Sequence, residues 1–172
     1  MTTKTVKVAL VDCGAAGKTS IVTRLSTGIF IERLMTVGFN VETWSVKEDG
    51  GDALVKAALF DFGGQEQFRF FQAGLMRGAI AVLLCVDVTR FMSLLELDDW
   101  LPLIEDIPKK QWILVANKID EGGLVTEDVI NEKAEEIGIP YLMVNAKTGE
   151  NFDVLTDKLS EIVLSQAIDQ FL

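Results

Sequence analysis

The stretch VALVDCGAAGKTS, Val8 to Ser20, decides the fold, because apolar strand-like residues run directly into a glycine-containing loop and then a lysine and a hydroxyl. The usual phosphate-binding loop has the pattern G-x-x-x-x-G-K-[ST], in which backbone N–H groups and the start of a helix bind an anion. Gly17, Lys18 and Thr19 complete this pattern, while Asp12 stands where the first glycine belongs. The stretch therefore predicts a strand, a phosphate-binding loop and a helix that begins at Lys18.

Two roles are open for the Asp12 side chain. It can turn away from the phosphate and accept a local backbone hydrogen bond, as aspartate commonly does in turns. Alternatively its charge weakens the binding of an anion, since a unit charge about 8 Å from a phosphate costs about 2 kcal/mol per phosphate charge at an effective dielectric near 20. Either role leaves a tight phosphate site in place.

The composition indicates one domain, 1–172, inside the cell. A chain of 172 residues suits a single domain with a full hydrophobic core. The net charge is −10 and no basic cluster interrupts the acidity, so we expect no nucleic-acid partner. The longest apolar run, 79–86, is too short to span a bilayer, and the N-terminal MTTKTVK is no signal peptide. We therefore expect a soluble, cytoplasmic protein.

The absence of histidine narrows the chemistry. The sequence holds none, which excludes histidine-based catalysis and most zinc sites. The two cysteines, Cys13 and Cys85, have no paired spacing, and we expect them to be free thiols of a reducing compartment. Any reaction must therefore use carboxylates, amides, lysine and backbone groups.

Strand-like segments alternate with helical ones along the chain. The sequence KEDGGD between the second and third strand-like segments favours an antiparallel hairpin. Alternating strands and helices with short connections imply an α/β fold: a six-stranded, mostly parallel sheet with one antiparallel strand and helices on both faces. The expected strands are 4–11, 39–46, 53–60, 79–86, 112–116 and 141–144.

The helices between these strands are predicted from apolar periodicity and capping residues. A helix is expected at 18–26, directly after the loop. Apolar residues at helical spacing predict further helices around 129–137 and 152–163. Ser93 and Glu96 form a capping-box pattern, which predicts that another helix starts there.

Four motifs each follow an expected strand, and ligands of such sheets bind at the carboxyl ends of the strands. They are the phosphate loop, DFGGQ at 61–65, NKID at 117–120 and NAK at 145–147. Asp61 can hold Mg²⁺ through water beside the Thr19 hydroxyl, and Gly64 can offer a backbone N–H to a terminal phosphate. Each motif alone fits an ordinary turn, but the four in this order indicate a nucleotide site.

The NKID motif selects the base. The Asp120 carboxylate can accept two hydrogen bonds from the ring N–H and exocyclic amine of guanine, whereas adenine would leave it unpaired. A site built to pair such groups rejects the analogue that lacks them by roughly 10⁴ to 10⁵. Asn117 would hold the base in place and Lys118 would lie over it. The Ala146 N–H would donate a hydrogen bond to the guanine carbonyl. We therefore expect GTP or GDP with Mg²⁺.

The motifs together resemble the Ras superfamily of small GTPases over nearly the whole chain, which implies the P-loop NTPase G-domain fold. The first third looks like the Arf branch in AAGKTS, in TVGFNVET at 36–43 and in the Gly-Gly-Gln of DFGGQ. The later part, VDVTRFMSLLELDDWL and NAKTGENFDVL, looks more like Rab and Ras.

The resemblance also implies roles for individual residues. Thr36 would sense the γ-phosphate through Mg²⁺, Phe30 would lie against the guanine or its ribose, and Gln65 would orient the attacking water. Gly14 leaves the loop open to an arginine supplied by an activating protein. The candidate site therefore comprises the catalytic residue Gln65, the Mg²⁺ ligands Thr19, Thr36 and Asp61 (through water), and the nucleotide-binding residues Gly14, Ala15, Ala16, Gly17, Lys18, Thr19, Ser20, Phe30, Thr36, Gly64, Asn117, Lys118, Asp120, Asn145, Ala146 and Lys147.

The function that the resemblance implies is a molecular switch in membrane traffic or signalling that hydrolyses GTP slowly. Activating proteins, exchange proteins and effectors would bind at 36–44 and 61–75. Neither Thr2 nor the final AIDQFL matches a lipidation signal, so we expect no encoded lipid anchor and any membrane contact through partners. A non-hydrolysing guanine-nucleotide-binding adaptor stays open as an alternative. Trp44, Phe68, Phe70 and Phe71 fit either the core or a partner-facing surface.

Overall fold

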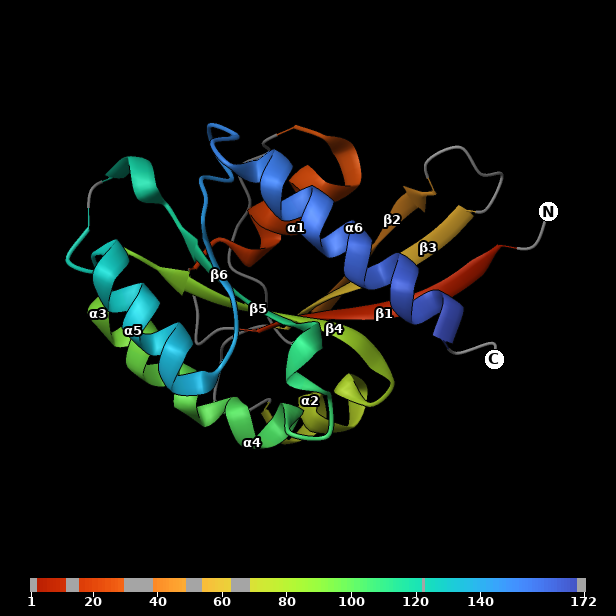
Figure 1. The fold of residues 1–172 in the computed structure, drawn as a ribbon, viewed down its shortest axis with the longest axis horizontal. Coiled ribbons are helices and arrows are strands. Elements are labelled where there is room, and N and C mark those ends of the chain that lie inside the picture. The colour runs from red at the N-terminus through yellow and green to blue at the C-terminus, as the bar shows by residue number, and fades with distance from the viewer. Residues whose placement is uncertain are drawn as a thin grey trace.

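The computed structural model describes residues 3–11, 16–29, 39–48, 54–62, 69–121 and 123–169. Its strands form one sheet in the order β2-β3-β1-β4-β5-β6 (Figure 1). Only β2 runs antiparallel to its neighbour β3, and the other pairs are parallel. The predicted sheet is confirmed. Its strands are β1 (Lys4–Val11), β2 (Phe39–Lys47), β3 (Leu54–Phe62), β4 (Ala79–Asp87), β5 (Trp112–Asn117) and β6 (Tyr141–Met143).

Helices cover both faces of the sheet, as predicted (Figure 1). Apolar residues of α1 and α6 pack on one face, and those of α2, α3, α4 and α5 pack on the other. The helices are α1 (Lys18–Thr27), α2 (Arg69–Met76), α3 (Phe91–Leu95), α4 (Leu101–Ile104), α5 (Glu127–Ile137) and α6 (Phe152–Asp169), with short 3₁₀ helices η2 (Glu96–Asp99), η3 (Lys109–Gln111) and η4 (Ile119–Glu121).

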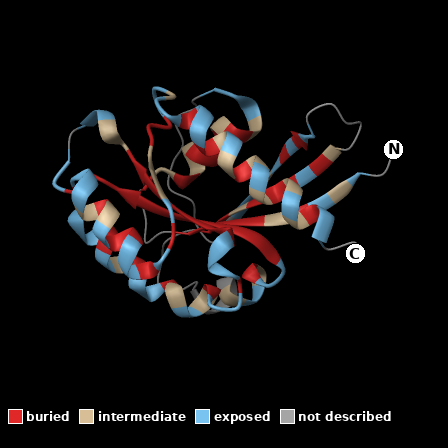
Figure 2. Ribbon diagram, in the orientation of Figure 1, coloured by how far each residue is buried: buried red, intermediate tan, exposed pale blue. Residues whose placement is uncertain are grey.

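The central strands β4 and β5 are buried along their whole length (Figure 2). Both faces of a central parallel strand are covered by helices, which explains why these strands read as continuous apolar runs. The consecutive residues Leu83 and Leu84 lie in the two different apolar clusters, one on each face of the sheet. Each such side chain contributes about 1.5–3 kcal/mol when it leaves water, so β4 stabilises both layers.

The prediction that Ser93 caps a helix is wrong. Helix α3 already begins at Phe91, and its N-cap residue Arg90 makes no side-chain capping bond. Ser93 lies inside this helix, is buried, and its hydroxyl accepts a hydrogen bond of 3.0 Å from the Asp87 N–H at the end of β4. The Ser93 hydroxyl therefore accepts a hydrogen bond from the backbone at the end of β4 and does not cap the start of a helix. Glu96 begins η2 instead of closing a capping box.

The hairpin of β2 and β3 settles the position of one aromatic residue. Trp44 pairs in register with Ala57, is 7% exposed and belongs to the apolar cluster beneath α1 and α6. Its core interpretation is therefore confirmed. Phe68 and the side chains of Phe70 and Phe71 lie outside the described residues.

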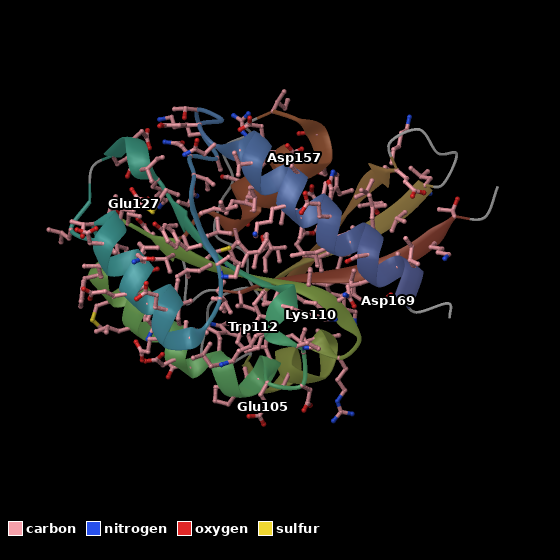
Figure 3. All side chains as sticks on the ribbon, viewed as in Figure 1. Glu105, Lys110, Trp112, Glu127, Asp157 and Asp169 are labelled. Atoms are coloured by element: carbon pink, nitrogen blue, oxygen red, sulfur yellow. The ribbon has the colours of Figure 1, made fainter. Side chains whose placement is uncertain are left out.

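The outer faces of the helices carry acidic side chains. Glu105, Asp157 and Asp169 are exposed, and Figure 3 shows them on the outside of the molecule. The Cys85 side chain is buried and its thiol donates to the Leu83 carbonyl at 3.8 Å, while Cys13 lies outside the described residues. Among the described helices, none combines the length and the apolar character that a membrane crossing requires.

Candidate nucleotide site

The described candidate residues gather at the carboxyl ends of β1, β3 and β5 and in the loop after β6. Because these strands are parallel, their carboxyl ends share one edge of the sheet. The candidate residues Gly14, Ala15, Phe30, Thr36, Gly64 and Gln65 lie outside the described residues, as does Asp12. The described candidates are Ala16, Gly17, Lys18, Thr19, Ser20, Asp61, Asn117, Lys118, Asp120, Asn145, Ala146 and Lys147.

Gly17 joins the predicted phosphate loop to α1. It has φ 81° and ψ 22°, a left-handed conformation that glycine adopts without strain, and its carbonyl accepts the Ile21 N–H at 2.9 Å. A Cβ at this position would overlap the Nδ2 atom of Asn117. Backbone conformation and close packing therefore both require glycine here.

Lys18, Thr19 and Asp61 form a polar cluster at the start of α1. The Lys18 Nζ lies 3.5 Å from the Asp61 Oδ1, and the two side chains are 6% and 0% exposed. The Thr19 hydroxyl donates a hydrogen bond of 2.5 Å to the Asp61 Oδ2. A hydroxyl and a carboxylate are oxygen ligands of the kind that Mg²⁺ prefers. The cluster thus fits a phosphate with its metal ion.

Asn117 connects three segments of the site. Its Nδ2 donates to the Ala16 carbonyl at 3.0 Å, and its Oδ1 accepts the Ala146 N–H at 3.0 Å. The side chain is 3% exposed, so both bonds are sheltered from water. The sequence prediction gave the Ala146 N–H to a guanine carbonyl, but here this N–H already donates to Asn117. Contact with the base would require the N–H to be shared.

Lys118 is held by a residue that the sequence analysis missed. It has a positive φ of 69°, and its ammonium donates to the Asp87 Oδ2 at 3.0 Å. The Asp87 Oδ1 accepts hydrogen bonds from the Thr89 N–H at 2.9 Å and the Thr89 hydroxyl at 2.5 Å. The available signal was the VDVT sequence, since it places polar residues at the carboxyl end of β4 on the same edge.

The environment of Asp87 sets its ionisation. Burial, the largest influence, raises the pKa of its carboxyl. Hydrogen bonds from the Thr89 hydroxyl, the Lys118 ammonium and the Thr89 N–H, together with the charge of Lys118, outweigh burial, so the pKa lies below the ordinary 3.8. The carboxylate is therefore ionised at neutral pH and pairs with the lysine of NKID.

We expect Asp87→Asn to lower the free energy of unfolding by about 1–3 kcal/mol at neutral pH, because charge-assisted hydrogen bonds to the carboxylate are lost. Since the native pKa is lowered, this contribution is complete above the unfolded pKa and is lost as the pH falls through the native pKa. Denaturant unfolding from neutral pH to about pH 3 checks this. Asp106→Asn, at an exposed carboxylate, is the control. A wild-type advantage that persists unchanged at low pH would contradict the assignment.

Asp120 lies in η4 and is exposed. Its carboxylate makes no hydrogen bond or ion pair with any residue in the described ranges. The turn that presents it is fixed by a hydrogen bond of 3.1 Å from the Glu121 N–H to the Lys118 carbonyl. The carboxylate is thus held on an ordered turn and remains accessible to a ligand.

Asn145 orders the NAK loop. Its Oδ1 accepts the Lys147 N–H at 2.9 Å and the Thr148 N–H at 3.0 Å, which fixes the orientation of the amide. The residue is 1% exposed, and its Nδ2 has no acceptor among the residues that the structure describes. A buried donor of this kind fits a site whose acceptor arrives with a ligand.

Arg24 is a second residue that the sequence analysis missed. From α1 its Nε donates to the Ala146 carbonyl at 2.6 Å, and its Nη2 donates to the Lys147 carbonyl at 2.9 Å. No motif includes this position. The available signal was an arginine six residues after Lys18, in a helix whose other residues are uncharged.

Comparison with known proteins identifies the family. The model of the Ras family matches residues 7–165. Ras-related protein Rab-26 of Bos taurus is 34% identical over 155 residues, which cover 86% of this chain and 59% of that protein. The human Rab-26 is 32% identical, with the same coverage of 86% and 59%. Ras-related protein RABD2a of Arabidopsis thaliana is 28% identical over 169 residues, 93% of this chain and 82% of that protein.

These relatives bear Rab names, in agreement with the Rab-like and Ras-like character predicted for the later part of the chain. The Arf-like character predicted for the first third is not shown by them and stays a prediction. The chain spans about 59% of the length of the Rab-26 relatives that it matches. The family match and the motifs at the carboxyl edge of the sheet agree, and the chain belongs to the Ras family.

Proposed function

We propose that the chain is a GTP-hydrolysing switch that binds GTP or GDP with Mg²⁺ and acts in membrane traffic or signalling. The observation that carries the proposal is the cluster at the start of α1 in which the buried Lys18 and the half-buried Thr19 both face the buried Asp61. Asn117 links the adjacent loop residue Ala16 to the NAK loop. The segments proposed to bind the phosphate and the base would thus be held together through Asn117. Membership of the Ras family supports the same function.

Different residues of the chain would bind the phosphates and the base of the nucleotide. Lys18 would bind the phosphates, and Asp120 would select guanine. Thr19 and Asp61, with Thr36 as predicted, would hold Mg²⁺, which would offset charge on the terminal phosphates. Gln65 would orient the attacking water, and Gly64 would donate its N–H to the terminal phosphate.

Partner proteins would distinguish the GTP-bound from the GDP-bound protein. We propose that activating proteins, exchange proteins and effectors bind at 36–44 and 61–75, and that the protein is cytoplasmic. No observation favours the alternative of a non-hydrolysing adaptor.

Single-turnover hydrolysis of bound GTP tests the proposal. We expect a rate on the order of 10⁻⁴ to 10⁻² s⁻¹ without partners. Gln65→Leu should lower this rate without weakening GTP binding, because leucine cannot orient water. Gln166→Leu makes the same chemical change at a residue whose side chain bonds that of Gln111, in η3 before β5, and should leave the rate unchanged. No hydrolysis by the wild type, or a rate unaffected by Gln65→Leu, would contradict the proposed activity.

A further inference from the structure

The guanidinium of Arg24 joins α1 to the loop that follows β6. Its Nε and Nη2 donate to two successive carbonyls, those of Ala146 and Lys147, at 2.6 and 2.9 Å. The planar fork of arginine donors suits such a pair of acceptors, whereas an ammonium is a single point charge. This contact therefore depends on arginine in particular.

An aromatic ring and a glycine lie next to the Arg24 guanidinium. Its Cζ lies 5.6 Å from the centre of the Phe152 ring at the start of α6, a cation–π arrangement. Gly149 has φ 87°, and a Cβ there would lie 3.0 Å from the Arg24 Nη1. No carboxylate of the described residues lies within ion-pair distance of Arg24. Its charge is thus directed at the loop carbonyls and not at an acidic side chain.

Helix α1 contributes residues to both parts of the proposed site, the part that binds phosphate and the loop next to the base. Lys18 and Thr19, in its first turn, face Asp61. Arg24 follows six residues after Lys18, about 9 Å along the helix axis at 1.5 Å per residue. One rigid helix therefore connects the phosphate-binding residues with the loop that carries Asn145, Ala146 and Lys147.

We propose that Arg24 is a positioning residue that holds the loop 145–149 against α1, so that the base and the phosphates are bound at a fixed spacing and the nucleotide is retained. The inference rests on the proposed function, because it requires a guanine nucleotide between α1 and this loop. By anchoring the two carbonyls, Arg24 also fixes the N–H groups of the same peptides, those of Lys147 and Thr148, which donate to the Asn145 Oδ1, and so holds the loop in one conformation. Loss of the Arg24 hydrogen bonds both speeds nucleotide release and lowers the preference for guanine over adenine.

The dissociation rate of a fluorescent GDP analogue, measured with Mg²⁺ present, tests this role. Arg24→Ala removes two charged donors and should speed release by about 10- to 100-fold. Arg24→Lys keeps the charge but not the fork, and should give a rate between those of the wild type and Arg24→Ala. Because the lysine variant preserves most of the packing, it also serves if Arg24→Ala does not fold.

Lys109→Ala is a matched control. The Lys109 ammonium also donates to a backbone carbonyl, that of Ile137 at 2.8 Å, and lies 6.0 Å from the centre of the Trp112 ring. Lys109 begins η3 and Trp112 begins β5, whereas Asn117 of the candidate site is at the other end of β5. Lys109→Ala should therefore leave GDP release unchanged.

A second readout separates positioning from general stabilisation. Competition of GDP and of ADP against the fluorescent analogue gives the guanine-to-adenine affinity ratio. We expect Arg24→Ala to lower this ratio by about tenfold, because the loop no longer orients its groups toward the base, and Lys109→Ala to preserve it. An equal loss of affinity for GDP and ADP, or release as slow as in the wild type, would overturn the role of Arg24. A wild type that does not bind GDP would instead overturn the proposed function.

Discussion

Replacement of Asp120 by asparagine is expected to change the preference of the chain from guanine to xanthine. The amide N–H₂ would face the xanthine carbonyl at the position where the carboxylate accepts the guanine amine. The expected loss of GDP affinity is about 10⁴-fold, the scale on which sites that pair polar groups reject a mismatched analogue. Competition of GDP and xanthosine diphosphate on both proteins measures the change.

The setting of Asp120 makes this result easy to interpret. The carboxylate is exposed and makes no hydrogen bond or ion pair with a residue in the described ranges, so its replacement should change stability by no more than about 0.5 kcal/mol. Glu121→Gln, at the next residue of η4, is also exposed and should leave both affinities unchanged. Unaltered GDP binding by Asp120→Asn would remove this residue from the site.

Asp61→Ala is expected to lower the free energy of unfolding by about 3–5 kcal/mol, because a buried lysine loses the carboxylate opposite it. Lys18 is 6% exposed and lies 3.5 Å from the Asp61 Oδ1, while Thr19 donates to the other oxygen. The same change should abolish the slowing of GDP release by Mg²⁺, since the metal loses the carboxylate that is proposed to hold it through water. Denaturant unfolding and GDP release with and without Mg²⁺ are the two measurements.

Asp87→Ala is the matched control for Asp61→Ala. Both carboxylates are buried and face a lysine of the site, but Asp87 pairs with Lys118, whose side chain is 30% exposed. Water can then solvate the remaining charge, so Asp87→Ala should cost less stability and retain the Mg²⁺ effect. Asp61→Asn, which preserves side-chain shape, replaces Asp61→Ala if that variant does not fold. A Mg²⁺ effect that survives the loss of the Asp61 carboxylate would contradict the metal assignment.

The sheet could be predicted from the sequence because its determinants are local. Strands β4 and β5 are apolar up to their last residues. Such runs are typical of parallel strands that helices cover on both faces. The segment 93–104 was harder, since its apolar residues fit one helix. The start of a separate helix α4 reflects Pro102 in its first turn, because proline lacks the N–H that a continuous helix would use there.

The candidate site could be predicted where its groups lie within a few residues of one another. The sequence shows Lys18 beside Gly17 and Asp120 close to Asn117, and the described parts of these motifs follow or end strands of the sheet. Arg24 could not be found in this way. Its partners are carbonyls more than 120 residues away, at |i−j| of 122 and 123, and any residue type can supply a carbonyl. Such contacts become visible only when the tertiary fold brings the segments together.

We propose above that the carboxyl edge of this sheet binds a guanine nucleotide with Mg²⁺. Titration of the wild-type protein with GDP and with ADP, each with and without Mg²⁺, tests this directly. We expect GDP to bind at least about 10⁴-fold more tightly than ADP and Mg²⁺ to strengthen GDP binding. Equal affinity for the two nucleotides, or GDP binding that Mg²⁺ does not affect, would contradict it.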